Sequence, residues 1–166
     1  MRKISTTLHL ALLLGVASTP AAAKFPSMPK ELLGVWFPDN AEGRNSCAAY
    51  TAAFQTGGLE AARDHLVGAE VISRRVVHSY AEYGEGNFYQ PTSIRNRGKK
   101  AWALKTRVGF DQMPGGEHTG SAEFKLSLRG DKLGWLNISY DGKPSERAEE
   151  ISLRRCADAP AKLYGG

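Results

Sequence analysis

Residues 121–140, SAEFKLSLRGDKLGWLNISY, contain the pattern that decides the fold. In the first half of this stretch every second side chain is apolar: Ala122, Phe124, Leu126 and Leu128. A period of two is typical of a β-strand with one face in a core and the other in water. Arg129-Gly130-Asp131 supplies turn residues, and the strand expected after it has Leu136, Ile138 and Tyr140 together on one face. The stretch therefore predicts an antiparallel β-hairpin.

Short runs of the same kind, separated by turn residues, continue along most of the chain. They predict strands over residues 69–73, 75–82, 87–95, 101–110, 121–128, 132–140 and 147–155. One of them places Trp102, Leu104, Thr106 and Val108 on one face. An earlier strand-like run begins at Leu32 and ends at the turn Pro38-Asp39-Asn40.

Consecutive strands without room for a crossover helix pair antiparallel. A series of about seven or eight such strands has costly open edges unless the sheet closes on itself. We therefore expect an all-β fold, a single antiparallel up-and-down barrel, with a two-sheet β-sandwich as the alternative. One short helix is expected near residues 58–67, where Leu59, Ala62 and Leu66 have helical spacing. The preceding SCAAYTAAF, residues 46–54, fits either a buried strand or a helix.

The N-terminus has the pattern of a secretory signal peptide. Basic residues at positions 2 and 3 precede an apolar run over residues 8–16, and Ala21 and Ala23 suit a cleavage site before Lys24. The run is too short to span a membrane, so we expect no membrane span and an exported protein, periplasmic in a bacterium and secreted otherwise. The expected organisation is a signal peptide at 1–23, an extended segment at 24–31, a barrel domain at 32–160 and a flexible tail at 161–166.

The two cysteines, Cys47 and Cys156, lie near opposite ends of the exported part. In an oxidising compartment an isolated pair allows one internal connectivity, so a structural disulfide between them is expected. A redox-active pair needs a short spacing such as Cys-x-x-Cys, which is absent from the sequence.

The Gly34-x-Trp36 pair, the early helix and the antiparallel series ending in Arg155 resemble the lipocalin-like (calycin) barrel family. The resemblance implies that Trp36 closes the floor of the barrel and that an arginine of the last strand packs over it. Arg155 suits this role because it shares the parity of Ile151 and Leu153, the expected inner face of that strand. A guanidinium over an indole face also gains cation–π energy. The early position of the helix and the missing Thr-Asp-Tyr element depart from secreted lipocalins, and a small barrel can be filled by its own side chains.

A weaker resemblance is to periplasmic inhibitors of secreted metalloproteases, which share the exported barrel, an early Gly-x-Trp and two cysteines. This resemblance implies that residues 24–31, KFPSMPKE, are an extended segment that enters an enzyme's cleft. In that family the cysteines lie close together near the start, whereas Cys47 and Cys156 are far apart.

Motifs of catalysis are absent from the sequence: it has no Gly-x-Ser-x-Gly, no His-Glu-x-x-His and no phosphate-binding loop. We therefore expect no enzyme, no cofactor and no metal site. The formal net charge of +5 includes two cations of the leader, and without a dense basic cluster nucleic acid is not an expected partner.

An aromatic cluster flanks the turn Gly84-Glu85-Gly86 and is the candidate binding site: Tyr80, Tyr83, Phe88 and Tyr89. Aromatic side chains at the rim of a barrel can contact a ligand or a protein partner. The expected function is a non-enzymatic exported barrel that binds a small apolar or amphipathic ligand, or an envelope protein, at its open end. The alternative is an inhibitor or interaction module for a secreted or periplasmic hydrolase.

Overall fold

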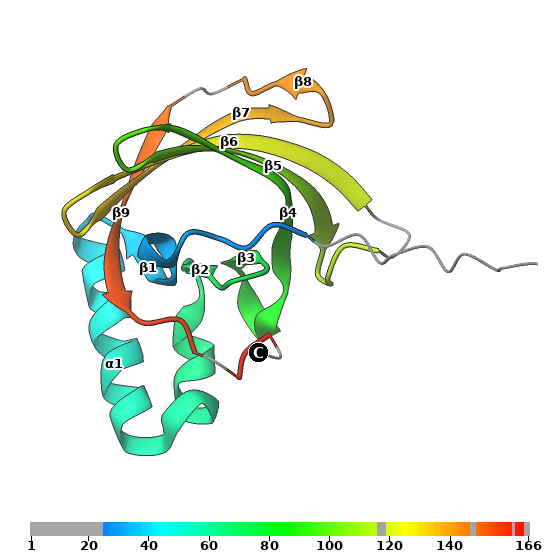
Figure 1. Ribbon diagram of the computed structural model, residues 1–166. Coiled ribbons are helices and arrows are strands. Elements are labelled where there is room, and N and C mark those ends of the chain that lie inside the picture. Colours follow the sequence, from blue (N-terminus) through cyan, green and yellow to red (C-terminus); the bar gives the residue numbers. More distant parts are fainter. Residues whose placement is uncertain (1–24, 116–118, 147–148, 161, 165–166) are drawn as a thin grey trace, which may run out of the picture.

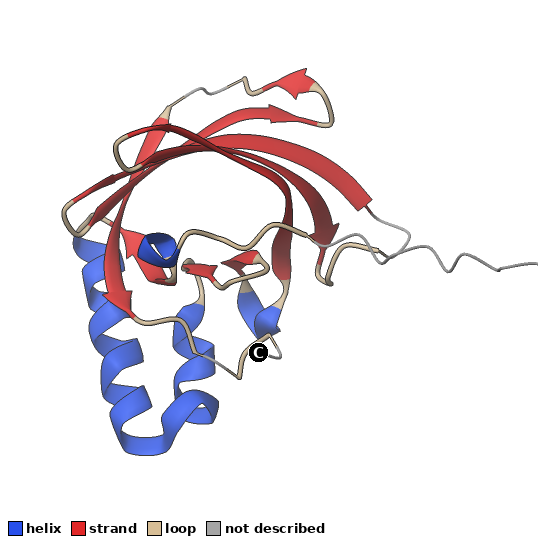
Figure 2. Cartoon of the chain, in the orientation of Figure 1, coloured by secondary structure: helices blue, strands red, loops and turns tan. Residues whose placement is uncertain are grey.

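The fold is a closed barrel of eight antiparallel strands with a ninth short strand and a helix on the outside (Figure 1, Figure 2). The computed structural model describes residues 25–115, 119–146, 149–160 and 162–164. The barrel strands are β1 (Gly34–Pro38), β2 (Glu70–Ile72), β3 (Val77–Tyr80), β4 (Gly86–Gly98), β5 (Ala101–Phe110), β6 (Thr119–Arg129), β7 (Lys132–Tyr140) and β9 (Glu150–Ala157). The predicted up-and-down barrel is confirmed, and the alternative sandwich is wrong.

The ring closes between the two ends of the chain. Strands β1 to β7 each pair with the next, and β9 pairs with β7 on one side and β1 on the other. The extra strand β8 (Lys143–Pro144) pairs only with the end of β7. Closure leaves no free edge in the ring, which removes the main route by which small sheets aggregate.

The barrel interior is filled by side chains. Its buried core is Trp36, Ile72, Val77, Trp102, Leu104, Val108, Ala122, Phe124, Leu126, Leu133, Trp135 and Leu153. At its centre Phe124 stacks on Trp135 with ring centroids 4.5 Å apart, and the edge of Tyr89 packs against both rings. The interior is thus a packed core, as in other small barrels.

The second strand of the opening hairpin differs from the prediction in one respect. A β-bulge opposite Glu123 and Phe124 shifts the register, so that Tyr140 lies opposite the inward-facing Ala122 while Leu136 lies opposite Lys125 on the outer face. Because the bulge breaks the period of two, Leu136 and Tyr140 do not share a face. Leu133 and Trp135 point into the core instead.

The connection from β1 to β2 contains the helix α1 (Ala41–Ala62) and the 3-10 turn η2 (Arg63–Leu66). The predicted helix is confirmed, and it begins well before residue 58, since residues 46–54, which fitted either a strand or a helix, are helical. Asn40 caps its start by accepting a 2.8 Å hydrogen bond from the Gly43 N–H, and Gly58, with a φ of 66°, interrupts the helical backbone. The helix covers the outer face of the barrel and builds a second core there. That core contains Val35, Phe37, Tyr50, Ala62, Leu66, Ala69, Val71 and Tyr80.

The predicted disulfide between Cys47 and Cys156 is confirmed. It joins α1 to β9 across 109 residues of sequence and lies beside the second core. The helix is therefore attached to the barrel covalently as well as by packing.

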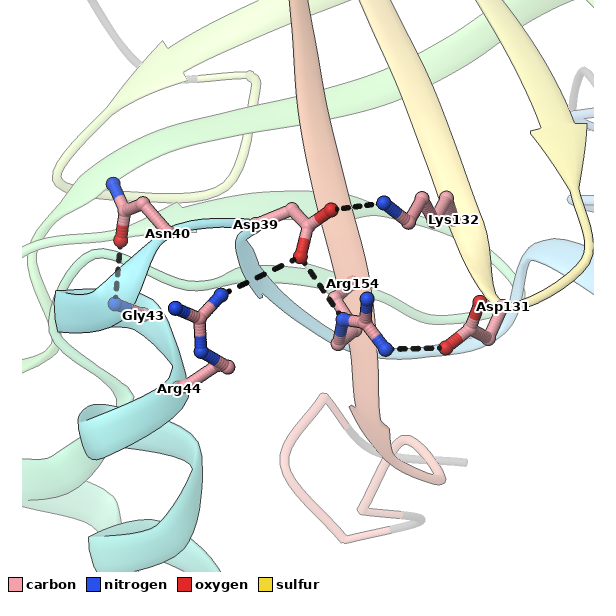
Figure 3. Close-up of polar contacts among 7 residues, drawn as sticks. All are labelled: Asp39, Asn40, Gly43, Arg44, Asp131, Lys132 and Arg154. Carbon is pink, nitrogen blue, oxygen red and sulfur yellow. Dashed lines mark hydrogen bonds and ion pairs between the residues drawn. The ribbon is translucent and has the colours of Figure 1, made fainter.

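Asp39 lies where β1 ends and α1 begins, and it is a centre of ion pairs (Figure 3). Its carboxylate accepts hydrogen bonds from Lys132 of β7 and, at 3.0 Å, from Arg154 of β9, and Arg44 of α1 lies 3.9 Å away. Arg154 also donates to Asp131 at 2.9 Å, so the Arg-Gly-Asp turn serves to hold the β6–β7 hairpin against β9. These donors lower the pKa of Asp39 to about 2.

The N-terminal segment crosses one opening of the ring (Figure 1). Met28 and Leu32 are buried in the barrel core, and the Met28 N–H donates to the Arg74 carbonyl at 2.9 Å. The 3-10 turn η1 (Lys30–Leu32) then leads into β1. The predicted signal peptide lies outside the described residues. None of the helices in the described part of the chain has the length and apolar character needed to cross a membrane.

Candidate functional site

The residues predicted to close the barrel lie together. Trp36 and Arg155 are opposite each other in the β1–β9 pair, and the guanidinium carbon lies 5.7 Å from the indole centroid. Arg155 also donates to the Leu33 carbonyl at 2.6 Å and to Asp158 at 2.9 Å. A side chain at Gly34 would place its Cβ only 3.2 Å from Arg155 Nε and 3.3 Å from Trp36 Nε1, so glycine leaves room for this contact.

The inner face predicted for β9 is only partly correct. Leu153 is buried in the core, whereas Ile151 is 49% exposed. The reason is the length of β1, because its last pair with β9 joins Pro38 to Leu153. Ile151 extends beyond that pair, where β1 no longer covers it.

Three of the four predicted aromatic residues meet in one place on the outer wall of the barrel. Tyr80, Tyr83 and Phe88 line a cavity of about 410 Å³, which we call the aromatic cavity. Tyr89 does not belong to it. Neighbouring residues of a strand point to opposite faces, so Tyr89 points into the barrel core while Phe88 points outward.

The aromatic cavity is assembled from distant parts of the chain. Strand β3 contributes His78 and Tyr80, β4 contributes Phe88, and the 3-10 turn η3 (Glu82–Gly84) between them contributes Tyr83. The other lining residues are Arg63, Gly84, Met113, Leu163 and Tyr164. Residues 161–166 were expected to form a flexible tail; of these the structure describes 162–164, and Leu163 and Tyr164 lie against the cavity.

His78 is the central polar group of the aromatic cavity and is 1% exposed. Its ring stacks on Phe88 with centroids 3.7 Å apart. One ring nitrogen, Nε2, lies 2.9 Å from the Glu85 carbonyl oxygen, and the other, Nδ1, lies 2.8 Å from the Tyr164 hydroxyl. A carbonyl only accepts, so Nε2 carries the hydrogen. Burial lowers the pKa of His78, so the ring is neutral and Nδ1 accepts the Tyr164 hydroxyl hydrogen.

The tyrosines of the aromatic cavity differ in exposure. Burial raises the pKa of Tyr164 and of Tyr80, so both hydroxyls keep their hydrogens at neutral pH. Tyr83, in contrast, is 93% exposed and has a positive φ of 57°, an uncommon conformation for a bulky residue. The tight turn around it holds its ring in solvent at the rim.

The aromatic cavity has few ionisable groups. Its described lining residues include no carboxylate, and its ionisable groups are the guanidinium of Arg63, the neutral His78 and the tyrosines. Both ring nitrogens of His78 take part in hydrogen bonds, Nδ1 with the Tyr164 hydroxyl and Nε2 with the Glu85 carbonyl. Within the described ranges, no group of three or more His, Cys, Asp or Glu residues is placed to hold a metal ion.

A second polar group, Glu70, lies inside the barrel. It lies opposite Trp36 in the β1–β2 pair. Its carboxylate accepts a hydrogen bond from the Ser79 hydroxyl, whose oxygen lies 2.7 Å from each carboxylate oxygen. Burial raises the pKa of Glu70 to about 7. No local pattern of residues marks this inward carboxylate.

Sequence reasoning missed His78 and Tyr164. His78 could have been found, since it alternates with Tyr80 on the strand that was predicted there. Tyr164 lies 86 residues from His78, beyond the last strand, and no local pattern connects the two.

Comparison of the chain with protein families, with curated proteins and with solved structures found no match.

Proposed function

We propose that this protein is a non-enzymatic, exported binding protein that holds a small apolar or amphipathic molecule in the aromatic cavity. The observation that supports this most is the convergence of Tyr80, Tyr83, Phe88, His78 and Tyr164 on one cavity. Its volume of about 410 Å³ lies within the range of small-molecule sites, and such sites combine apolar walls with a few fixed polar groups. The proposed site is on the outer wall of the barrel, since the interior is filled.

The shape of the lining favours a flat, unsaturated or aromatic ligand. Phe88 and His78 form a stacked pair, and Tyr164 approaches both at nearly a right angle. A further ring in offset or edge contact with such a group gains about 0.5–1.5 kcal/mol beyond its buried area. Arg63 adds a positive charge at the lining, which suits an amphipathic molecule.

Export is part of the proposal and has support from the covalent structure. The Cys47–Cys156 disulfide fits an oxidising compartment, and the leader pattern fits secretion, with the periplasm as the place of action in a bacterium. Membership of the lipocalin-like family is likewise a proposal, which the meander of eight antiparallel strands and the Trp36–Arg155 contact support.

The alternative, inhibition of a hydrolase through residues 24–31, has less support. Met28 is buried in the core and its N–H is bonded to Arg74, so this part of the segment serves the barrel itself. The exposed Tyr83 favours a different contact, in which an envelope protein covers the rim of the aromatic cavity. A pull-down from envelope extract tests that contact, and retention that is equal for wild type and Tyr83→Ala would count against it.

A fluorescence titration with N-phenyl-1-naphthylamine, a neutral aromatic probe, tests the proposed ligand site. Met113→Trp fills part of the aromatic cavity, and we expect it to weaken binding about tenfold or more, which corresponds to about 1.4 kcal/mol. Phe54→Trp is the matched control, because Phe54 and Met113 are both 44% exposed and Phe54 lies on α1 outside the cavity. Equal affinity in both variants, or no binding by the wild type, would contradict the proposal.

A further inference from the structure

A second cavity, of about 510 Å³, lies where the β2–β3 turn approaches the segment that follows β9. Four cationic side chains line it: Lys30, Arg74, Arg75 and Arg155. Asp158 is the one carboxylate among its described lining residues. We call it the basic cavity.

The positive charge of the basic cavity is mostly uncompensated. Asp158 is bonded to Arg155, and within the described chain no ion pair involves Lys30, Arg74 or Arg75. The situation differs from that at Asp39, where Arg154 and Lys132 both have an acidic partner. Like charges that share one cavity repel one another, and an anion between them would relieve the repulsion.

The two arginines stand on a turn whose backbone is fixed. The Ser73 hydroxyl donates a hydrogen bond to the Val76 carbonyl at 2.9 Å. Its oxygen also accepts hydrogen bonds from the backbone N–H groups of Val76, at 3.2 Å, and Arg75, at 3.4 Å. The Arg74 carbonyl accepts the Met28 N–H at 2.9 Å. The guanidinium groups therefore start from an ordered backbone, which reduces the entropy that is lost when a ligand binds.

The rest of the basic cavity is apolar. Leu33, Ala159 and Pro160 line it, together with Tyr164, which also lines the aromatic cavity. A site with guanidinium groups on one side and apolar side chains on the other suits a molecule that has both kinds of surface. Arginine binds carboxylate and phosphate through paired N–H groups, so either head group fits.

We propose that the basic cavity binds a small organic anion, a carboxylate or phosphate ester with an apolar body, with Arg74 and Arg75 holding the anionic group. Lys30 adds charge, and Leu33 and Tyr164 contact the apolar body. The site is distinct from the aromatic cavity and does not depend on the function proposed for it, although Tyr164 belongs to both walls.

The test compares two probes that share one aromatic skeleton. 8-Anilinonaphthalene-1-sulfonate carries an anionic group, and N-phenyl-1-naphthylamine is its neutral counterpart. We expect Arg74→Gln/Arg75→Gln to weaken binding of the anionic probe about tenfold or more and to leave that of the neutral probe unchanged. Both arginines are exposed, so the fold should be retained, and a circular dichroism spectrum checks this. Lys30→Gln should give a smaller loss of the same kind.

Arg95→Gln/Arg97→Gln is the matched control, since these two arginines are also exposed, belong to β4 and do not line the basic cavity. The proposal is overturned if this control weakens the anionic probe as much as Arg74→Gln/Arg75→Gln does, or if the latter has no effect. Raising the salt concentration should weaken the anionic probe alone.

The two proposals fail in different ways. Arginine-dependent binding of the anionic probe that persists in Met113→Trp supports the basic cavity even where the neutral probe does not bind at all. Loss of the anionic probe in Met113→Trp, with no dependence on Arg74 and Arg75, would instead place that probe in the aromatic cavity and contradict the inference.

Discussion

Arg155 stands over Trp36, with its guanidinium carbon 5.7 Å from the centroid of the indole ring. The two residues lie on the last and first strands of the barrel, and they face each other where those strands pair. The indole N–H donates to the Leu32 carbonyl at 2.9 Å, and Arg155 donates to the neighbouring Leu33 carbonyl. The contact thus fastens the closing strand to the segment that enters the barrel.

Truncation of Trp36 should be among the most damaging single changes in the barrel. Trp36 is fully buried, and Trp36→Ala should lower the free energy of unfolding by about 3–5 kcal/mol, from lost burial and the cavity left behind. Urea denaturation followed by circular dichroism measures the loss. A cost below about 1 kcal/mol would mean that the indole is not part of the core.

Removal of the disulfide should destabilise the protein without changing the strand order. Cys47→Ala/Cys156→Ala should cost about 2–4 kcal/mol, since the bridge closes a loop of 109 residues in the unfolded chain. Thermal unfolding of the wild type with and without reductant should give a fall in Tm in the same direction. Identical midpoints with and without the bond would contradict this role.

The inward carboxyl of Glu70 should make stability fall as pH rises. Its pKa is about 7 in the folded protein against 4.5 for the ordinary side chain, so between these values the unfolded state releases the proton and the folded state keeps it. Glu70→Gln should therefore match the wild type near pH 4 and be more stable by about 3 kcal/mol above pH 7.

Urea denaturation at several pH values measures this difference for Glu70→Gln. Glu60→Gln, at an exposed position of α1, controls for the substitution itself. A stability difference between wild type and Glu70→Gln that does not change with pH would show that the carboxyl titrates normally.

Asp39 should act in the opposite direction at low pH. Its folded pKa of about 2 lies below the ordinary 3.8, so its ion pairs stabilise the protein above pH 4 and are lost as pH falls toward 2. Asp39→Asn should lower Tm at pH 7 and leave it nearly unchanged at pH 2. A Tm difference between the two proteins that is as large at pH 2 as at pH 7 would contradict the assignment.

Local sequence patterns predicted the architecture because the barrel is built from neighbouring strands. The alternation from Ala122 to Leu128 is a local signal, and each β-hairpin places its own partner close by. The alternation of side chains along a strand also placed Arg155 on the same side as Leu153. The structure confirms the predicted contact between Arg155 and Trp36.

Features that depend on irregular or distant contacts escaped prediction. The bulge opposite Glu123 and Phe124 changes the face of Leu136 without a glycine or proline to mark it. The early start of α1 was hidden by an alanine-rich stretch that fits two kinds of structure. Tyr164 contacts His78 only because the fold brings residues 162–164 next to β3, and Met28 is buried only because its segment crosses an opening of the folded barrel.

If the aromatic cavity holds a ligand, the imidazole of His78 should sense it, because its ring is part of the cavity lining. In ¹H–¹³C NMR spectra with N-phenyl-1-naphthylamine added to saturation, the ring signals of His78 should shift, because that ring lines the cavity and is stacked on Phe88. Those of His65, exposed on η2 and outside the lining, should stay in place. Unchanged His78 signals at saturating probe would show that the probe does not bind in the aromatic cavity.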